Sequence, residues 1–350
     1  MTARPILITK RLFESEKPRQ RPGVRRASGA FGRLAAYEKL QRAGALQNAL
    51  ALAFIAVLLI AAKPVQAQWE QLPSLPEPNG GFVCGHEKGK IVVIGGTNWE
   101  GGKKNWLGQR HEFDPVQKTW STVPNVKEPI SYAVVMQYED EMSRMGGFNG
   151  QNTQRKYQWV LAAGGAVRGE QGGYYDLAVG GTDDPSNLAG VTRETWKSGK
   201  DTTRMADYPG KPFITAASAV LGSELFVFGG MNLDAGNQTP VNTDVAYAFS
   251  PSKNVWRPLK ALNRAKRGLT AVTLDEKHIY IAGGYADDFT AEAVIYDMTT
   301  DSYRAAKPLP YAAMVGLVKL GEFVYCLGGE DKMKHRTDKF FRIPVAELLK

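Results

Sequence analysis

The chain has 350 residues and a formal net charge of +9, from 44 Lys and Arg against 35 Asp and Glu. The excess lies in the first 67 residues, which hold twelve basic and three acidic side chains, so residues 68–350 hold 32 of each sign. A neutral body has no general electrostatic attraction for phosphate backbones. The charge pattern therefore excludes nucleic acid as a partner. The four His are scattered without the spacing of metal ligands, so we expect neither a metal nor another cofactor.

The N-terminal region carries the features of an export signal. Residues 49–62 (ALALAFIAVLLIAA) are an uninterrupted apolar run that follows a basic stretch. This run is shorter than the roughly twenty residues that a membrane-spanning helix needs. Val65-Gln66-Ala67 resembles a small-residue cleavage site. We expect residues 1–67 to be a basic leader with a helical signal segment. The alternative is an uncleaved anchor, which would give the protein its only membrane contact. Either way, residues 68–350 would be periplasmic or secreted.

An internal repeat organises the rest of the chain. Six Gly-Gly doublets follow short, mostly apolar segments at steps of 51, 34, 49, 54 and 45 residues: Gly95-Gly96, Gly146-Gly147, Gly180-Gly181, Gly229-Gly230, Gly283-Gly284 and Gly328-Gly329. An aromatic residue, six others and then Trp or Tyr recur in phase with the doublets: Phe113 to Trp120, Phe249 to Trp256 and Tyr296 to Tyr303. Such short strands at a period near 50 residues indicate the blades of a β-propeller.

The two ends of this region complement one another. Trp69-x-x-Leu72-Pro73 looks like the close of a blade without a beginning, and the segment 323–343 has strands but no closing Trp. We therefore expect an all-β, six-bladed kelch-type propeller over residues 68–350, closed by its N-terminal strand. The short step between Gly146 and Gly180 leaves a second possibility, which is five intact blades and one reduced blade.

The doublets and aromatic spacing resemble the kelch superfamily over residues 69–345. A narrower resemblance is to the N-acetylneuraminate (sialic acid) mutarotases, particularly their cyclically permuted form. The segments that carry it are 69–73, 128–132 (EPISY), 146–150 (GGFNG), 208–212 (YPGKP), 228–232 (FGGMN) and 263–269 (NRAKRGL). This resemblance implies an exported isomerase that interconverts sialic acid anomers after sialidases release the sugar, with a small sugar or glycan as its partner.

Mutarotation needs a base for the anomeric hydroxyl proton and an acid for the ring oxygen. The carboxylate of the sugar favours a bidentate Arg. In a propeller we expect the ligand at one mouth of the channel, between the loops after the doublets and those leading into the innermost strands. Glu128 and Arg267 lie before expected inner strands and are the predicted catalytic residues. Each has a structural alternative: Glu128 as a solvated loop acid, and Arg267 as part of an ion pair between blades.

Four further residues are predicted to bind the substrate. Glu330 and Arg336 follow the last doublet, Asn232 follows the fourth doublet, and Lys211 lies in the segment 209–212. A plain surface loop is the alternative for Glu330 and Arg336, and turn formation is the alternative for Asn232.

Two other functions remain open. One is a non-catalytic propeller that binds a glycan or a protein partner, since fold does not fix function. The other is a copper oxidase, which the scattered His and the setting of the cysteines disfavour. Cys84 and Cys326 are either one disulfide or two buried thiols. The oligomeric state is left open.

Overall fold

A computed structural model describes residues 68–123, 128–151, 158–185, 190–199, 201–233 and 239–350. The chain divides into two units, residues 1–65 and 66–350, and every described residue belongs to the second. The expected leader, with its apolar run and cleavage site, lies outside the described residues. Within the described ranges, no helix is both long enough and apolar enough to span a bilayer.

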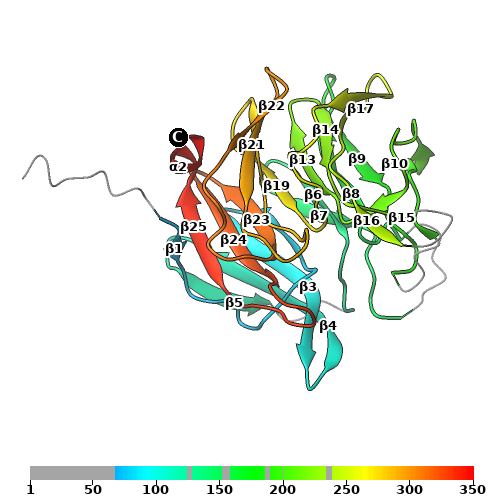
Figure 1. The fold of residues 1–350 in the computed structure, drawn as a ribbon. Helices are drawn as coiled ribbons and strands as arrows, with labels where there is room; N and C mark the ends of the chain where they lie inside the picture. Colours follow the sequence, from blue (N-terminus) through cyan, green and yellow to red (C-terminus); the bar gives the residue numbers. More distant parts are fainter. Residues whose placement is uncertain (1–67, 124–127, 152–157, 186–189, 200, 234–238) are drawn as a thin grey trace, which may run out of the picture. The chain divides into compact units, whose positions relative to one another are not determined.

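Five antiparallel sheets of four strands make up most of the described chain (Figure 1). The first three contain β2 (Val83–Glu87), β3 (Lys90–Glu100), β4 (Lys103–Asp114) and β5 (Thr119–Val123); β8 (Ala163–Arg168), β9 (Tyr174–Val179), β10 (Thr195–Ser198) and β11 (Thr203–Arg204); and β13 (Ala217–Leu221), β14 (Glu224–Phe228), β17 (Ala246–Ser250) and β18 (Val255–Leu259). The other two contain β19 (Thr270–Thr273), β20 (His278–Ala282), β21 (Ala293–Asp297) and β22 (Ser302–Ala305); and β23 (Met314–Leu320), β24 (Phe323–Glu330), β25 (Phe340–Pro344) and β1 (Glu70–Gln71).

A two-stranded sheet of β6 (Val134–Gln137) and β7 (Met142–Met145) stands between β5 and β8 in the chain. The first strands of the six sheets contact one another in a closed circle, in the order β2, β6, β8, β13, β19, β23 and back to β2. The fold is thus all-β, with several four-stranded antiparallel sheets that are consistent with kelch propeller blades. The short step of 34 residues, between the second and the third doublet, begins directly after β7 of the two-stranded sheet.

The Gly-Gly doublets join each sheet to the next. All twelve glycines have positive φ, a region that side-chain-bearing residues rarely adopt. The backbone N–H of each second glycine donates to a carbonyl that lies shortly before the innermost strand of the next sheet. The six bonds, of 2.7 to 3.0 Å, are Gly96 to Ile130, Gly147 to Gln158, Gly181 to Phe213, Gly230 to Lys266, Gly284 to Ala313 and Gly329 to Asn79. The last bond brings the end of the chain back to its beginning.

The aromatic pairs face each other across adjacent strands. Phe113 is opposite Trp120 and Phe249 is opposite Trp256, with ring centroids 5.1 and 4.8 Å apart. Both rings of the first pair also contact Phe340 on β25, which belongs to another sheet. Such ring pairs contribute about 0.5–1.5 kcal/mol beyond the area they bury. These rings therefore pack between neighbouring sheets.

The hydrophobic core is divided into clusters that lie between consecutive sheets. One cluster joins the β13–β18 and β19–β22 sheets through Phe226, Phe228 and Tyr296, and another joins the β23–β25 and β2–β5 sheets through Leu327 and Phe113. Because each sheet buries both of its faces against neighbours, no sheet has a complete core alone.

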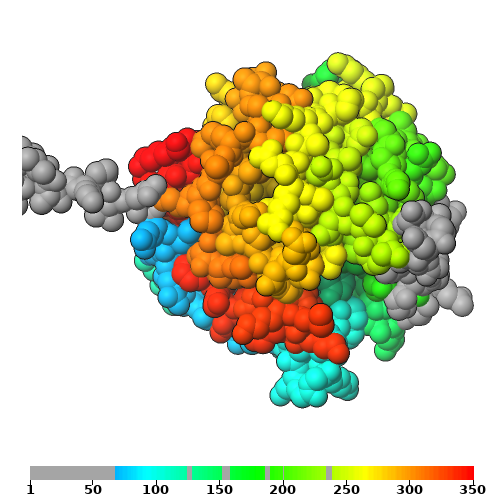
Figure 2. All heavy atoms as spheres, in the orientation of Figure 1, coloured from blue at the N-terminus to red at the C-terminus, as the bar shows by residue number. Residues whose placement is uncertain are grey.

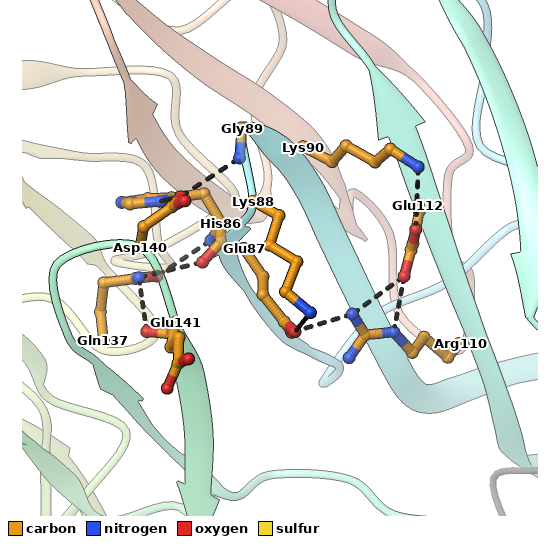
Figure 3. A network of polar contacts seen from close by, with 10 residues as sticks. All are labelled: His86, Glu87, Lys88, Gly89, Lys90, Arg110, Glu112, Gln137, Asp140 and Glu141. Carbon is orange, nitrogen blue, oxygen red and sulfur yellow. Dashed lines mark hydrogen bonds and ion pairs between the residues drawn. The ribbon is translucent and has the colours of Figure 1, made fainter.

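The junction between β2 and β6 contains a polar bridge (Figure 3). The Gln137 side chain accepts a hydrogen bond from the backbone N–H of His86 (2.9 Å) and donates to the carbonyl of the same residue (3.0 Å). It also donates to the carbonyl of Glu141, at 2.9 Å. The side-chain amide of Gln137 therefore pairs with both backbone groups of His86, as a residue of a neighbouring strand would, and links the sheets that contain β2 and β6. Burial lowers the pKa of His86 and outweighs the opposite effect of Asp140.

We predict that Gln137→Leu destabilises the protein by about 1–3 kcal/mol, because it leaves the backbone N–H and carbonyl of His86 without their partner. Denaturant unfolding at an unchanged m-value measures this loss. Gln109→Leu, on an exposed position of β4, is the matched control and should change stability by less than about 0.5 kcal/mol. An equal effect of the two substitutions would contradict the role of the bridge.

The N-terminal strand completes the last sheet, as expected. Glu70 is opposite Arg342 and Gln71 is opposite Phe341 in the antiparallel pair of β1 and β25. In Figure 2 the blue start of the described chain accordingly lies against its red end. Two features were not expected. The helix α2 (Val345–Leu349) follows β25, and β12 (Phe213–Ile214), β15 (Met231–Leu233) and β16 (Pro240–Asn242) form an additional three-stranded sheet.

Candidate functional site

A cavity of about 1020 Å³ lies inside the circle of innermost strands. Small residues on these strands, such as Gly85, Gly164 and Ala217, make room for it. Glu330 and Arg336 line it at the end of β24 that follows the last doublet, and Glu322 lines it at the opposite end of β24. The cavity therefore follows the length of the innermost strands.

The most buried charge in this cavity is that of Arg336, whose side chain is 5% exposed. Its Nη1 lies 2.9 Å from Oε2 of Glu330, and the same nitrogen donates to the His335 carbonyl at 3.2 Å. The Arg336 Nε is buried without a hydrogen-bond partner. Gly80 makes this position possible, because a Cβ there would lie 2.4 Å from Cδ of Arg336. The Arg336 guanidinium therefore has N–H donors other than those on Nη1, which bind Glu330 and the His335 carbonyl.

Tyr132 lines the same cavity from the segment that leads into β6. Its φ is 59°, a left-handed conformation that is uncommon for a bulky residue. Hydrogen bonds fix it there: its N–H donates to Gly81 (2.7 Å), and its carbonyl accepts from Leu161 (3.0 Å). The ring lies over Gly81, where a Cβ would come within 2.3 Å of a ring carbon.

The hydroxyl of Tyr132 is held by the β3–β4 hairpin, which projects beyond the neighbouring sheets (Figures 1 and 2). Lys104 Nζ donates to this hydroxyl at 2.7 Å, and Thr97 Oγ1 lies 3.4 Å from it. The Lys104 Nζ also lies 4.6 Å from the ring centroid of Trp106. Burial raises the pKa of Tyr132, but the charge and hydrogen bond of Lys104 outweigh it, so the pKa lies below its usual value.

Neither Tyr132 nor Lys104 is among the site residues predicted from the sequence. The Gly101-Gly102 pair between two alternating segments is a hairpin signal that would have placed Thr97, Lys104 and Trp106 on one face. Their approach to Tyr132 is a tertiary contact and leaves no local pattern.

The two predicted catalytic residues do not line the central cavity. Arg267 precedes β19 as expected, but its Nη1 donates to Asn242 Oδ1 at 3.0 Å and its guanidinium lies 4.5 Å from the ring centroid of Tyr285. It packs against the three-stranded sheet because β16 carries Asn242. Glu128 is exposed and does not line the cavity, whereas Tyr132, four residues later in the chain, does.

Lys211 and Asn232 line a different cavity, of about 720 Å³. Asn232 lies on β15, opposite Phe213 of β12, so the additional sheet directs this segment away from the axis. Arg204 pairs there with Glu194 and Asp207, each at 2.9 Å. The structure thus brings together Glu330 and Arg336 at the central cavity, which the other four predicted residues do not line.

Neither cysteine forms a disulfide in the structure. Burial raises the pKa of the Cys84 thiol to about 12 and raises that of Cys326 further. These thiols are packed as small apolar side chains, which was one of the two alternatives. Among the described residues, no group of three or more His, Cys, Asp or Glu side chains is arranged to hold a metal ion.

Comparison with known proteins identifies a kelch motif at residues 213–263, the region of the β13–β18 sheet. The chain is 39% identical over 95 residues to an N-acetylneuraminate epimerase of Yersinia pestis (strain Pestoides F), a match that covers 26% of this chain and 24% of that protein. It is 28% identical over 186 residues to an N-acetylneuraminate epimerase of Salmonella paratyphi B (strain ATCC BAA-1250 / SPB7), covering 42% of this chain and 48% of that protein.

The mouse Kelch-like protein 35 is 26% identical over 310 residues, which is 79% of this chain and 50% of that protein. The chain spans about a quarter of the length of the Yersinia relative and about half of the other two. The resemblance to kelch proteins and to N-acetylneuraminate epimerases is confirmed.

Proposed function

We propose that residues 68–350 form a six-bladed kelch propeller that interconverts the anomers of sialic acid by general acid–base catalysis. The closed circle of six innermost strands supports the blade number, with β6 and β7 as a reduced blade. The partial similarity to N-acetylneuraminate epimerases supports the substrate class.

The observation that carries the proposal is the Arg336–Glu330 pair at the cavity wall. Arg336 is buried, charged and lines the cavity beside Glu330, so its guanidinium is the group that can offer a ligand carboxylate a charge-assisted hydrogen bond. Glu330 is half-buried beside it and lines the same cavity, and we assign to its carboxylate the role of taking the anomeric proton. Opening the ring breaks the bond between the anomeric carbon and the ring oxygen, and closing it on the other face reforms that bond. The reaction is an isomerisation, so it consumes no co-reactant.

The direct test is proton NMR of N-acetylneuraminate freshly released by a sialidase, with and without the protein. Faster equilibration of the two anomers supports the proposal. Binding of the sugar without acceleration would instead favour the non-catalytic propeller. If the protein neither binds the sugar nor accelerates its equilibration, the proposed function is wrong.

We predict that Arg336→Lys raises the KM for N-acetylneuraminate by about ten- to a hundredfold, because an ammonium loses the planar fork of donors. Initial rates across sugar concentrations measure this change. Arg264→Lys is the control, since Arg264 forms its ion pairs with Asp287 and Glu292 outside the cavity. A KM that stays at the wild-type value would show that Arg336 does not hold the substrate.

We also propose that the protein is exported, because an apolar run and a small-residue cleavage site precede residue 68 in the sequence. N-terminal sequencing of protein recovered outside the cytoplasm tests this. A mature chain that begins at Gln68 supports cleavage, and an intact N-terminus in the membrane fraction supports an anchor.

A further inference from the structure

The hydroxyl of Tyr132 has an arrangement that leaves its own proton available. An ammonium group only donates hydrogen bonds, so at the 2.7 Å contact with Lys104 the phenolic oxygen is the acceptor. The phenolic proton must therefore point elsewhere, and the other near protein oxygen is Thr97 Oγ1 at 3.4 Å, a long contact. A ligand oxygen at the usual O–H···O distance of about 2.7–2.8 Å would be a better acceptor for this proton than Thr97.

The groups around Tyr132 favour the loss of that proton. Lys104 faces it from β4, Arg336 acts on it from the segment between β24 and β25, and the neutral Thr97 faces it from β3. Both charged groups are cations, and both stabilise a phenolate. Their effect lowers the pKa of Tyr132 despite its burial. Since Tyr132 lines the same cavity as Glu330 and Arg336, its proton and the Glu330 carboxylate are offered to one ligand.

We propose that Tyr132 is the general acid that protonates the ring oxygen of the sugar, and that Lys104 is the positioning residue that holds its hydroxyl. This inference rests on the function proposed above. Glu330 takes the anomeric hydroxyl proton while the carbonyl forms, the bond from the anomeric carbon to the ring oxygen breaks, and that oxygen takes the Tyr132 proton. The resulting phenolate is stabilised by Lys104 and Arg336. After rotation of the open chain, the reverse steps restore both groups.

The first test is Tyr132→Phe, which keeps the ring over Gly81 and removes only the hydroxyl. We expect kcat for anomer equilibration to fall by about 10²-fold or more, with sugar binding retained, because general acid–base groups contribute about 10²- to 10⁴-fold. Tyr303→Phe is the matched control: its hydroxyl donates to the Lys260 carbonyl outside the cavity, and its kcat should stay at the wild-type value.

The second test is the pH dependence of kcat. The proposed acid acts in its neutral form, so the rate should fall as pH rises through the pKa of Tyr132. Lys104→Met removes the nearest cation, which raises that pKa and moves the alkaline fall to higher pH. Lys104→Arg should move it less, and Lys103→Met, on the exposed tip of the same hairpin, should leave it in place. Ultraviolet titration of tyrosinate in wild type and Lys104→Met measures the same shift without substrate.

The outcomes separate the two proposals. A folded wild-type protein that does not accelerate equilibration overturns the proposed function and, with it, the catalytic role of Tyr132. An active wild type whose Tyr132→Phe variant keeps its kcat overturns the role of Tyr132 alone. An alkaline fall that does not move in Lys104→Met, or that moves to lower pH, overturns the role of Lys104.

Discussion

Glu330→Gln is expected to lower the kcat for anomer interconversion by about 10²-fold or more, which is the lower bound of what a positioned general base contributes. The amide keeps the size of the side chain and can still accept a hydrogen bond from Arg336 Nη1, which lies 2.9 Å from Oε2 in the native pair. The variant should therefore fold and bind the sugar. The rate of anomer equilibration by NMR, with binding measured by calorimetry, separates loss of chemistry from loss of binding.

Glu322→Gln is the matched control for this substitution. Glu322 lines the same cavity but lies at the other end of β24, away from Arg336. Its replacement should change kcat by less than about threefold, a difference of under 1 kcal/mol in barrier. If both variants lost activity equally, the charge of the whole cavity would matter rather than the base at position 330, and the assignment of Glu330 would be wrong.

Gly329→Ala is expected to destabilise the protein by about 2–5 kcal/mol. Its φ is 101°, and a Cβ would lie 2.0 Å from the Met314 carbonyl oxygen. A left-handed backbone costs a side-chain-bearing residue about 1–2 kcal/mol, and the shift needed to relieve such overlap costs about 1–3 kcal/mol more. The same glycine donates the bond to Asn79 that joins the last sheet to the first, so the shift would strain the closure.

Gly321→Ala separates the two contributions to that loss. Gly321 also has a positive φ, of 57°, but a Cβ there meets no atom within 4 Å. We expect it to cost only about 1–2 kcal/mol. Denaturant midpoints at constant m-value compare the two variants. Equal losses would mean that backbone conformation alone, and not the close approach to Met314, makes Gly329 necessary.

The features that the sequence predicts well are those that repeat. Both glycines of each doublet need positive φ, and the aromatic pairs face each other across a short turn, so both leave a pattern in the residues themselves. The pairing of β1 with β25 was predictable for a related reason. The short strand near Trp69 has no partner close to it in the sequence, and the sheet of β23, β24 and β25 has no fourth strand after it. Each therefore supplies what the other lacks.

The site was predicted less well because its residues meet only through the fold. Asn232 was expected to face the channel because it lies a fixed number of residues after a doublet. In the structure β15 pairs with β12 and β16, so Asn232 belongs to the additional sheet and not to the channel. Arg267 likewise turns to Asn242 on that sheet. Glu330 and Arg336 lie together because the loop between β24 and β25 is short enough to return Arg336 over Gly80.

The pairing of β1 with β25 also determines the order in which the protein can be assembled. Glu70 and Arg342 are 272 residues apart, so this sheet combines the first and the last strands of the described residues. Contacts between such distant residues form slowly, since the intervening chain must be ordered first. Until β25 is in place, β1 has no partner and the last sheet lacks two of its four strands. A chain that stops before Phe340 therefore lacks both the partner of β1 and the strand that follows Arg336.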